Sequence, residues 1–397
     1  MPPPSSGRPR GLFALLVLAF VAAHTLFVHG QMKGMGRYSD EGHHLRQVQR
    51  FCNGDFTVDP KITTIPGYHL LASLAGGLTG DCSLATLRLV NVASGALSVG
   101  VFLLAAHRAG ARYPILRALQ FSVFPILLPY HFLAYTDSVA LLLVLVSMTL
   151  LLSDRPAAAG LAACASLLVR QTHVAWLLFI VLYVLADDPR GFLRKVWPCL
   201  LGIGGFVVFV LVNGGVALHD RSAHRPGLHV GNVFLCLFLF FFLFLPANVS
   251  WLWKGRMRLA ERPLGAILGA AALLLFFGYS AYHPYNHFQG FLHNDLVTAV
   301  DASPSARVAF FVPVAAALAA LYVGRLSRAP FYALYPVALL TLLPDGLIEH
   351  RYYLVPYALF LLFREDLPLV VEWAGVALSL VAADGLVYGL SRGLFAL

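Results

Sequence analysis

Residues 11–30 have the sequence GLFALLVLAFVAAHTLFVHG, which contains no Asp, Glu, Lys or Arg. A helix needs about 20 such apolar residues to cross the hydrocarbon core of a bilayer. Similar apolar stretches recur along all 397 residues, and the chain is 59% hydrophobic and 12% charged. Soluble globular proteins are typically about 45–50% apolar and about 25% charged. The sequence therefore predicts an all-α polytopic membrane protein that forms a single integral membrane domain over residues 1–397.

The apolar stretches predict roughly thirteen transmembrane helices, within a range of about 11–14. These helices are expected at 11–30, 85–106, 118–135, 138–153, 157–170, 173–186, 196–215, 230–252, 264–282, 308–324, 330–344, 352–363 and 368–390. Residues 67–80 are apolar but too short to cross a bilayer, so we expect them to be re-entrant or interfacial.

Arg and Lys collect in the N-terminus and in alternate loops, which are therefore assigned to the cytoplasmic side. The net charge of +9 fits contact with anionic lipid there. No basic soluble region is present that would bind nucleic acid. The complementary loops, here called the outer loops, face the lumen of the endoplasmic reticulum (ER) or the periplasm. They are residues 31–66, 135–137, 170–173, 214–229, 283–307 and 344–351.

The first outer loop contains two adjacent carboxylates, Asp40 and Glu41, within the sequence YSDEGHH of residues 38–44. The apolar spacing predicts a helix over residues 40–51, which would place Asp40 and His44 on one face. A carboxylate in this position can act as a general base toward a sugar hydroxyl, and a neighbouring group can tune its pKa. The alternative is that the acidic pair caps and solvates an interfacial helix. The residues alone do not decide which of the two carboxylates would be the base.

Arginines at the ends of predicted helices form a second signal, with Arg170, Arg221 and Arg351 all on the outer side. An arginine at the membrane boundary can bind a lipid-linked phosphate with two parallel hydrogen bonds. Each of them alone is also explained by snorkelling to the interface. Three on one side, with Glu349 and Tyr352 beside Arg351, favour a phosphate site.

The remaining outer loops supply further polar groups. Asp220, His224 and His229 are predicted to hydrogen-bond phosphate or sugar, because the histidine spacing there fits no compact metal site. Residues 59–67 form a proline-bounded segment that either presents Asp59, Thr63 and Thr64 to a ligand or serves as a plain connector. Residues 283–295 mix aromatic side chains with His and Asn, a combination that stacks on sugars or anchors a chain at the interface.

The cysteines divide by their predicted side. Cys52 and Cys82 both fall on the oxidising side, where they can pair, whereas Cys164, Cys199 and Cys236 lie in or near helices. A small apolar role is expected for the latter three.

Several separated motifs together resemble one family. They are Asp40-Glu41 with His44, Gln47, Gln49-Arg50 and Cys52; Asp59-Pro60 with Ile62-Thr63-Thr64 and Pro66-Gly67; Arg88 with Val90-Asn91; Phe124-Pro125 and Tyr135-Thr136; Arg170-Gln171-Thr172; Val212-Asn213-Gly214-Gly215 with Asp220-Arg221-Ser222, His224 and His229; and Glu349, Arg351-Tyr352 and Pro356-Tyr357. The chain resembles the dolichyl-phosphate-glucose-dependent α-1,2-glucosyltransferases of asparagine-linked glycosylation. That family adds the terminal glucose to the lipid-linked oligosaccharide.

The resemblance implies a fold of the GT-C type, with the catalytic Asp in the first outer loop, and an inverting displacement that uses a polyprenyl-phosphate sugar as donor. It implies no cofactor and no bound divalent metal. Asp40 would be the base, with Glu41 as the second candidate. Arg351, helped by Arg170, Arg221, His224 and Tyr352, would bind the donor phosphate. The substrate-binding candidates are His44, Asp59, Thr63, Thr64, Gln171, Asp220, His229 and Glu349.

Two features depart from the family pattern. Asp137 stands where the family tends to carry Glu, and residues 283–295 do not reproduce its Asp-Asn-Arg-His-Tyr run. A bacterial relative in an inner membrane, with another polyprenyl donor, another sugar and another acceptor, is therefore an alternative to an ER enzyme.

A transporter or flippase of lipid-linked sugars is the alternative from a different class. It would need ionisable groups at mid-membrane and access from both sides. Asp384, inside the last predicted helix, is the residue that fits this requirement.

Overall fold

The computed structural model describes residues 7–219, 227–261, 264–274, 279 and 283–397. Regular structure in these ranges consists of helices, with two isolated β-bridges. The α-helices are α1 (Gly7–Met32), α2 (Glu41–Cys52), α3 (Gly67–Thr79), α4 (Leu84–Arg108), α5 (Pro114–Ser122), α6 (Asp137–Leu151), α7 (Pro156–Leu167), α8 (Val174–Asp187), α9 (Phe192–Asn213), α10 (Gly231–Leu243), α11 (Leu245–Glu261), α12 (Leu264–Leu273), α13 (Leu292–Ala302), α14 (Pro304–Val323), α15 (Leu334–Leu342), α16 (Leu354–Phe363) and α17 (Leu369–Ser391). Short 3-10 helices are η1 (Leu128–His131), η2 (Gln171–His173), η4 (Pro284–His287), η5 (Ala329–Ala333) and η6 (His350–Tyr353).

The helices of membrane-spanning length are fewer than the sequence predicts. In the described part of the chain, α1, α4, α9, α14 and α17 are the 5 helices long and apolar enough to cross a membrane. The pair α10 and α11 makes a sixth if its 89° bend lies within one span. Other apolar helices have 10–17 residues, fewer than the about 20 that a helix needs to cross a bilayer. The chain is an integral membrane protein with several spanning helices.

Prolines explain where the predicted spans are divided. The expected helix at 118–135 instead ends with α5 at Ser122, and the following segment contains Pro125 and Pro129. Proline removes a backbone donor and clashes with the preceding turn, so it breaks an apolar run that hydropathy alone treats as continuous. Pro246 lies at the break between α10 and α11 in the same way.

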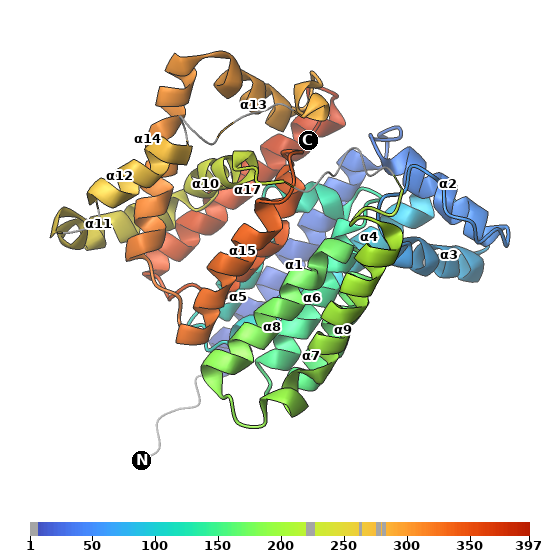
Figure 1. Cartoon of the computed structure of the whole chain (residues 1–397), viewed down its shortest axis with the longest axis horizontal. Helices are drawn as coiled ribbons and strands as arrows, with labels where there is room; N and C mark the ends of the chain where they lie inside the picture. Colours follow the sequence, from blue (N-terminus) through green and yellow to red (C-terminus); the bar gives the residue numbers. More distant parts are fainter. Residues whose placement is uncertain (1–6, 220–226, 262–263, 275–278, 280–282) are drawn as a thin grey trace.

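The first outer loop contains one short helix, and a second short helix follows it directly. The helix predicted over residues 40–51 is α2, and the short apolar segment at 67–80 is α3, which packs against α2 (Figure 1). A disulfide joins Cys52 to Cys82, with Cα atoms 6.7 Å apart. Gly76 lets α3 approach this bridge, because a Cβ there would lie 2.4 Å from the Cys82 sulfur.

The long helices form two neighbouring groups. Helices α6, α7, α8 and α9 pack on one another, and α4 packs on α6. Helices α10, α11 and α12 pack around α14, while α17 contacts α1, α5 and α11 (Figure 1). The C-terminus lies beside α13 at the end of the molecule that also carries α2 and α3 (Figure 1). The outer loops therefore gather at one end of the helices.

Candidate active site

A cavity of about 910 Å³ opens where the outer loops meet. Each of the six predicted outer loops contributes to its wall. One lining residue from each loop, in chain order, is Asp40, Tyr135, Arg170, Val216, His293 and Arg351. A volume near 1,000 Å³ is at the upper end of typical small-molecule sites, so this cavity is the candidate functional site.

The cavity is amphipathic. Apolar side chains line it below the loops, from α6, α8, α9, α15 and α16. They include Leu141, Leu178, Ile203, Phe206, Val207, Leu340 and Val355. The arrangement can hold a ligand that combines a charged head with an apolar chain, because each part would find matching surroundings.

Asp40 presents an accessible carboxylate to this cavity. It immediately precedes α2, and its backbone N–H donates to the Tyr135 hydroxyl at 3.2 Å. Its carboxylate lies 3.6 Å from the Arg351 guanidinium, and its side chain is 49% exposed. Ser39 has φ of 41°, a conformation that costs energy for a residue with a side chain and is found at functional sites. Asp40 can therefore take a proton from a bound hydroxyl.

Glu41 has no free hydrogen-bonding capacity. Its Oε1 accepts from Arg88 Nε at 2.9 Å and from the Ala134 N–H at 2.7 Å. Its Oε2 accepts from Arg88 Nη2 at 2.6 Å and from the Tyr38 N–H at 2.8 Å. The residue is 0% exposed. Glu41 thus joins the first outer loop to α4 and to the segment before α6.

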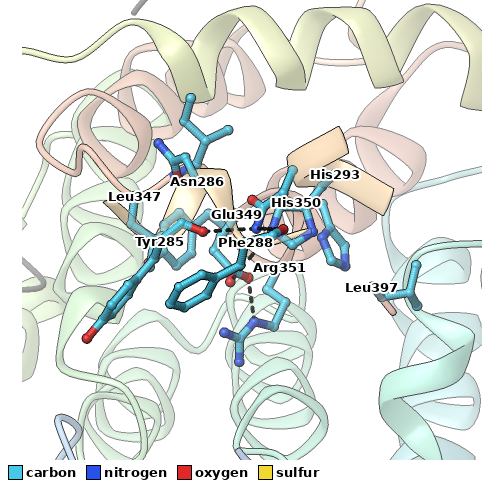
Figure 2. Close-up of polar contacts among 12 residues, drawn as sticks. Tyr285, Asn286, Phe288, His293, Leu347, Glu349, His350, Arg351 and Leu397 are labelled. Atoms are coloured by element: carbon cyan, nitrogen blue, oxygen red, sulfur yellow. Dashed lines mark hydrogen bonds and ion pairs between the residues drawn. The ribbon is translucent and has the colours of Figure 1, made fainter. Parts of the chain in front are cut away.

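Arg351 is held between carboxylates at the cavity wall. Its Nε donates to Glu349 at 2.7 Å (Figure 2). Its guanidinium lies 5.0 Å from the centre of the Tyr135 ring. Burial alone would raise the pKa of Glu349, but Arg351 and His293 together lower it to about 2. Glu349 therefore stays ionised, and Arg351 carries its charge in a fixed position where it can bind an anion.

Arg170 and Gln171 lie on the neighbouring wall. Arg170 forms an ion pair with Asp137. The Gln171 amide donates to the carbonyls of Thr63 at 2.7 Å and Val216 at 3.0 Å, and accepts from the Ile65 N–H at 3.2 Å. Gln171 thus ties three outer loops together, while Thr63 and Thr64 line the cavity.

His44 and Tyr352 complete the predicted residues that reach the cavity. A His44 ring nitrogen hydrogen-bonds His69 at 2.9 Å. Burial, followed by the charge of Arg351, lowers the pKa of His44 to about 3, so its ring is neutral. The Tyr352 hydroxyl donates to Asp345 at 3.2 Å.

The matched family covers most of the chain. The DIE2/ALG10 family profile matches residues 35–191 and 185–362. The chain belongs to the DIE2/ALG10 family. This confirms the resemblance on which the sequence-based assignment rests.

Relatives in this family carry one name, Dol-P-Glc:Glc(2)Man(9)GlcNAc(2)-PP-Dol alpha-1,2-glucosyltransferase. The Candida albicans protein is 27% identical over 82% of this chain and 84% of its own length. The Rattus norvegicus protein is 25% identical over 84% of both chains. The Drosophila melanogaster protein is 28% identical over 81% of this chain and 82% of its own. No solved structure matches the chain.

Some predicted residues of this DIE2/ALG10 chain are not at the cavity. Asp59 accepts from the Lys61 N–H at 2.9 Å and lies 3.6 Å from Arg46, so it shapes its own loop. His229 does not line the cavity, and its backbone N–H donates to the Leu343 carbonyl at 2.8 Å. Asp220, Arg221 and His224 lie outside the described residues.

Other cavity residues were not among the site residues that the sequence analysis names, although it assigned the aromatic segment 283–295 to sugar stacking or anchoring. Tyr285 and Phe288 stack on each other with ring centres 5.2 Å apart, and both are exposed at the cavity (Figure 2). Leu397 also lines it, because the Tyr38 hydroxyl donates to the Leu397 carbonyl at 3.0 Å. The aromatic residues in the fifth outer loop, 283–307, were the signal for the first pair. Nothing in the sequence indicates that residues 38 and 397 meet.

One group of residues could hold a metal ion. Among the described residues, His293, Glu349 and His350 offer ligand atoms that all lie within 4.8 Å of one another. Arg351 donates to the same Glu349 carboxylate, so a cation here would lie beside an existing positive charge. Like charges repel strongly in a site of low dielectric, which disfavours a divalent ion at this position.

Proposed function

We propose that this chain transfers glucose, in α-1,2 linkage, from dolichyl-phosphate-glucose to a lipid-linked oligosaccharide. The enzyme class, a glycosyltransferase that acts on lipid-linked oligosaccharide, follows from the family and from the name shared by its relatives. The observation that carries the mechanism is the position of Asp40. Its accessible carboxylate lies 3.6 Å from Arg351 in a cavity that continues between apolar helices.

The reaction is an inverting displacement. Asp40 takes the proton from the acceptor hydroxyl while that oxygen attacks the anomeric carbon of the donor sugar. The bond from the anomeric carbon to the phosphate oxygen breaks on the opposite face. Arg351 and Arg170 stabilise the negative charge that develops on the departing lipid phosphate. Glu41 takes no part in proton transfer, because its two oxygens already accept four hydrogen bonds from the protein.

No metal or other cofactor is needed in this mechanism. A lipid monophosphate leaves with less charge than a nucleoside diphosphate, and arginines can stabilise it through paired hydrogen bonds. The apolar part of the cavity would hold the first isoprene units of the donor. Tyr285 and Phe288 offer an exposed aromatic surface on which an acceptor sugar can stack.

The site is proposed to face the ER lumen. The Cys52–Cys82 disulfide supports this orientation, because disulfides persist on the oxidising side of a membrane. The charge pattern of the loops agrees apart from the Lys and Arg of the first outer loop, since the other basic clusters lie in the opposite set of loops. The relatives from a fungus, a rodent and an insect support the ER over a bacterial inner membrane.

A flippase or transporter is less well supported. Its expected mid-membrane group, Asp384 of α17, hydrogen-bonds His24 of α1 at 2.9 Å. Polar contacts of this kind join helices within a membrane, so the pair has a structural explanation.

The test is transfer of radiolabelled sugar from synthetic polyprenyl-phosphate-glucose to a lipid-linked glycan, with purified protein and EDTA present. Wild type is expected to transfer glucose despite chelation, and Asp40→Asn to bind donor without transferring it. Transfer that requires added metal would contradict the metal-free mechanism. Movement of the lipid across liposomes, without transfer from any of several donor sugars, would identify a transporter instead.

A further inference from the structure

Asp137 has an oxygen that the protein leaves without a partner. The residue begins α6, and its side chain lies on the cavity wall and is 4% exposed. Its Oδ1 accepts from Arg170. Its Oδ2 is buried and has no hydrogen-bond partner among the described residues. Leaving a buried acceptor unpaired is unfavourable, and more so when the group is charged, so a native structure rarely leaves such an oxygen for packing alone.

Asp345 is a cavity carboxylate whose hydrogen bonding differs from that of Asp137. Asp345 also lines the cavity, but its Oδ1 accepts from the Leu347 N–H at 2.9 Å and its Oδ2 from the Tyr352 hydroxyl at 3.2 Å. Both of its oxygens are therefore used by the protein. At Asp137 the ion pair with Arg170 fixes the carboxylate and uses one oxygen. The second oxygen keeps its capacity to accept a hydrogen bond, in a residue that lines the cavity.

The position is close to the proposed reaction centre. Tyr135, two residues before Asp137, accepts from the Asp40 N–H and carries its ring against the Arg351 guanidinium. Asp137 and its partner Arg170 therefore belong to the wall that also holds the proposed base and the proposed phosphate ligand. A sugar joined directly to a phosphate bound there would bring its hydroxyls to this wall.

We propose that Oδ2 of Asp137 accepts a hydrogen bond from a hydroxyl of the donor sugar and so helps the enzyme to select that sugar. The inference rests on the proposed glycosyltransferase function and names one residue that reads its donor. Arg170 has two roles here, because it orients Asp137 and contributes positive charge beside the phosphate. A sugar that lacks the matching hydroxyl would leave Oδ2 unpaired inside the cavity, which is how a site built for a hydroxyl rejects the analogue without it.

The test pairs changes in the protein with changes in the donor. Four synthetic polyprenyl-phosphate-glucose donors, each lacking one hydroxyl at position 2, 3, 4 or 6 of the sugar, are compared with the intact donor. Each is assayed with wild type and Asp137→Ala. A hydrogen bond to a charged group contributes about 1.5–3 kcal/mol, or about 10- to 150-fold. With wild type, we expect one deoxy donor to have a kcat/KM lower than that of the intact donor by about that factor. With Asp137→Ala, the same deoxy donor and the intact donor should differ little in kcat/KM.

Two additions keep the result interpretable. Asp345→Asn is the matched control, and all four deoxy losses should remain as large in this variant as in wild type. If Asp137→Ala does not fold, Asp137→Asn keeps the shape but removes the charge. It should reduce the discrimination, because the sugar hydroxyl then meets a neutral amide instead of a carboxylate. In wild type, the kcat/KM of at least one deoxy donor must be at least tenfold below that of the intact donor.

Several results would overturn the inference. Losses that are the same in wild type and in Asp137→Ala for every deoxy donor would show that Asp137 does not contact the donor sugar. Coupling of Asp137 to a deoxy acceptor instead would assign the residue to the acceptor. Both results leave glucose transfer by wild type intact. Failure of wild type with the intact donor would refute the proposed function itself, so the two failures are distinguishable.

Discussion

Asp40 and Glu41 are adjacent carboxylates that each lie beside an arginine. Only in the pair of Glu41 do protein groups occupy both carboxylate oxygens. Glu41 is 0% exposed, and Arg88 and two backbone N–H groups occupy both of its oxygens. Asp40 lies 3.6 Å from Arg351 with a side chain that is 49% exposed. We call Glu41–Arg88 a closed pair and Asp40–Arg351 an open pair.

The same contrast recurs in other parts of the molecule. Glu372 and Arg364 form a second closed pair, in which Glu372 Oε1 accepts from Arg364 at 2.8 Å and from the Leu367 N–H at 3.2 Å. Both side chains are buried, and neither lines the cavity. Asp137 and Arg170 form a second open pair at the cavity wall. Closed pairs join segments of the chain, whereas open pairs keep hydrogen-bonding capacity available to a substrate.

Loss of Asp40 tests the open pair and should have the largest effect. Asp40→Asn removes the proposed base, and general bases contribute about 10²- to 10⁴-fold to rate. We expect kcat to fall by that factor and the thermal unfolding midpoint to change little, because the side chain is half exposed. Initial rates of glucose transfer and thermal unfolding in detergent measure the two effects. Asp55→Asn, an exposed carboxylate in the same loop, is the control and should retain activity.

Loss of Glu41 tests the closed pair and should act on stability. Glu41→Gln leaves the Arg88 charge buried without its counterion, which typically costs about 3–5 kcal/mol. Chemical denaturation in detergent micelles measures the change. Replacing Arg88 as well, in Glu41→Gln/Arg88→Met, should recover part of the loss because no unpaired charge remains. A Glu41→Gln protein of normal stability but without activity would show that the closed pair has a catalytic role.

The sequence could predict the elements that depend on local pattern. Helix α2 and the short apolar helix α3 follow from spacing and length, and the two outer cysteines form the disulfide that their shared side allowed. The distribution of Arg and Lys assigned the six outer loops to one side of the membrane, and each of these loops contributes to the same cavity. Fewer helices reach spanning length than hydropathy predicts, in part because hydropathy does not register the break that Pro125 and Pro129 produce.

The sequence could not distinguish the closed pair from the open pair. Glu41 and Arg88 are 47 positions apart, and their contact exists only after the first outer loop folds back on α4. The unpaired oxygen of Asp137 depends on the position of Arg170, 33 residues away. Whether all hydrogen-bonding positions of a carboxylate are occupied depends on the folded structure. The fold therefore distinguishes two adjacent carboxylates that look equivalent in the sequence. The catalytic and binding roles assigned to these residues stay predictions.

The pH dependence of stability tests the neutral histidine next to the open pair. Burial, followed by the nearby His293, lowers the pKa of His350 from 6.5 to about 3 in the folded protein. The unfolded chain therefore binds a proton that the folded chain does not between about pH 6.5 and pH 3, and folding loses stability as the pH falls through this window. The loss from this residue approaches about 1.4 kcal/mol per pH unit. Above pH 7 it contributes no slope.

Thermal unfolding from pH 7.5 to pH 5 measures this effect in wild type and His350→Gln. The variant should show a shallower dependence on pH. His107→Gln, which removes an exposed ring, should leave the wild-type slope unchanged. An unaltered slope in His350→Gln would show that the His350 ring takes up its proton over the same pH range in the folded and the unfolded chain, which would contradict the lowered pKa.

Replacement of the second closed pair should have the smallest effect, and it therefore tests the distinction most directly. If Arg364 and Glu372 only join α16 to α17, then Arg364→Met/Glu372→Leu removes both charges together and leaves no unpaired ion. Such exchanges of buried ion pairs for apolar residues of similar volume are often neutral or stabilising by about 1–4 kcal/mol. The lost partner of the Leu367 N–H opposes this gain, so we expect stability within about 1 kcal/mol of wild type and unchanged kcat. The single variant Glu372→Gln, which leaves Arg364 unpaired, should be much less stable than the double variant. A double variant that folds normally but transfers glucose slowly would mean that hydrogen-bond completion does not separate structural from functional ion pairs in this protein.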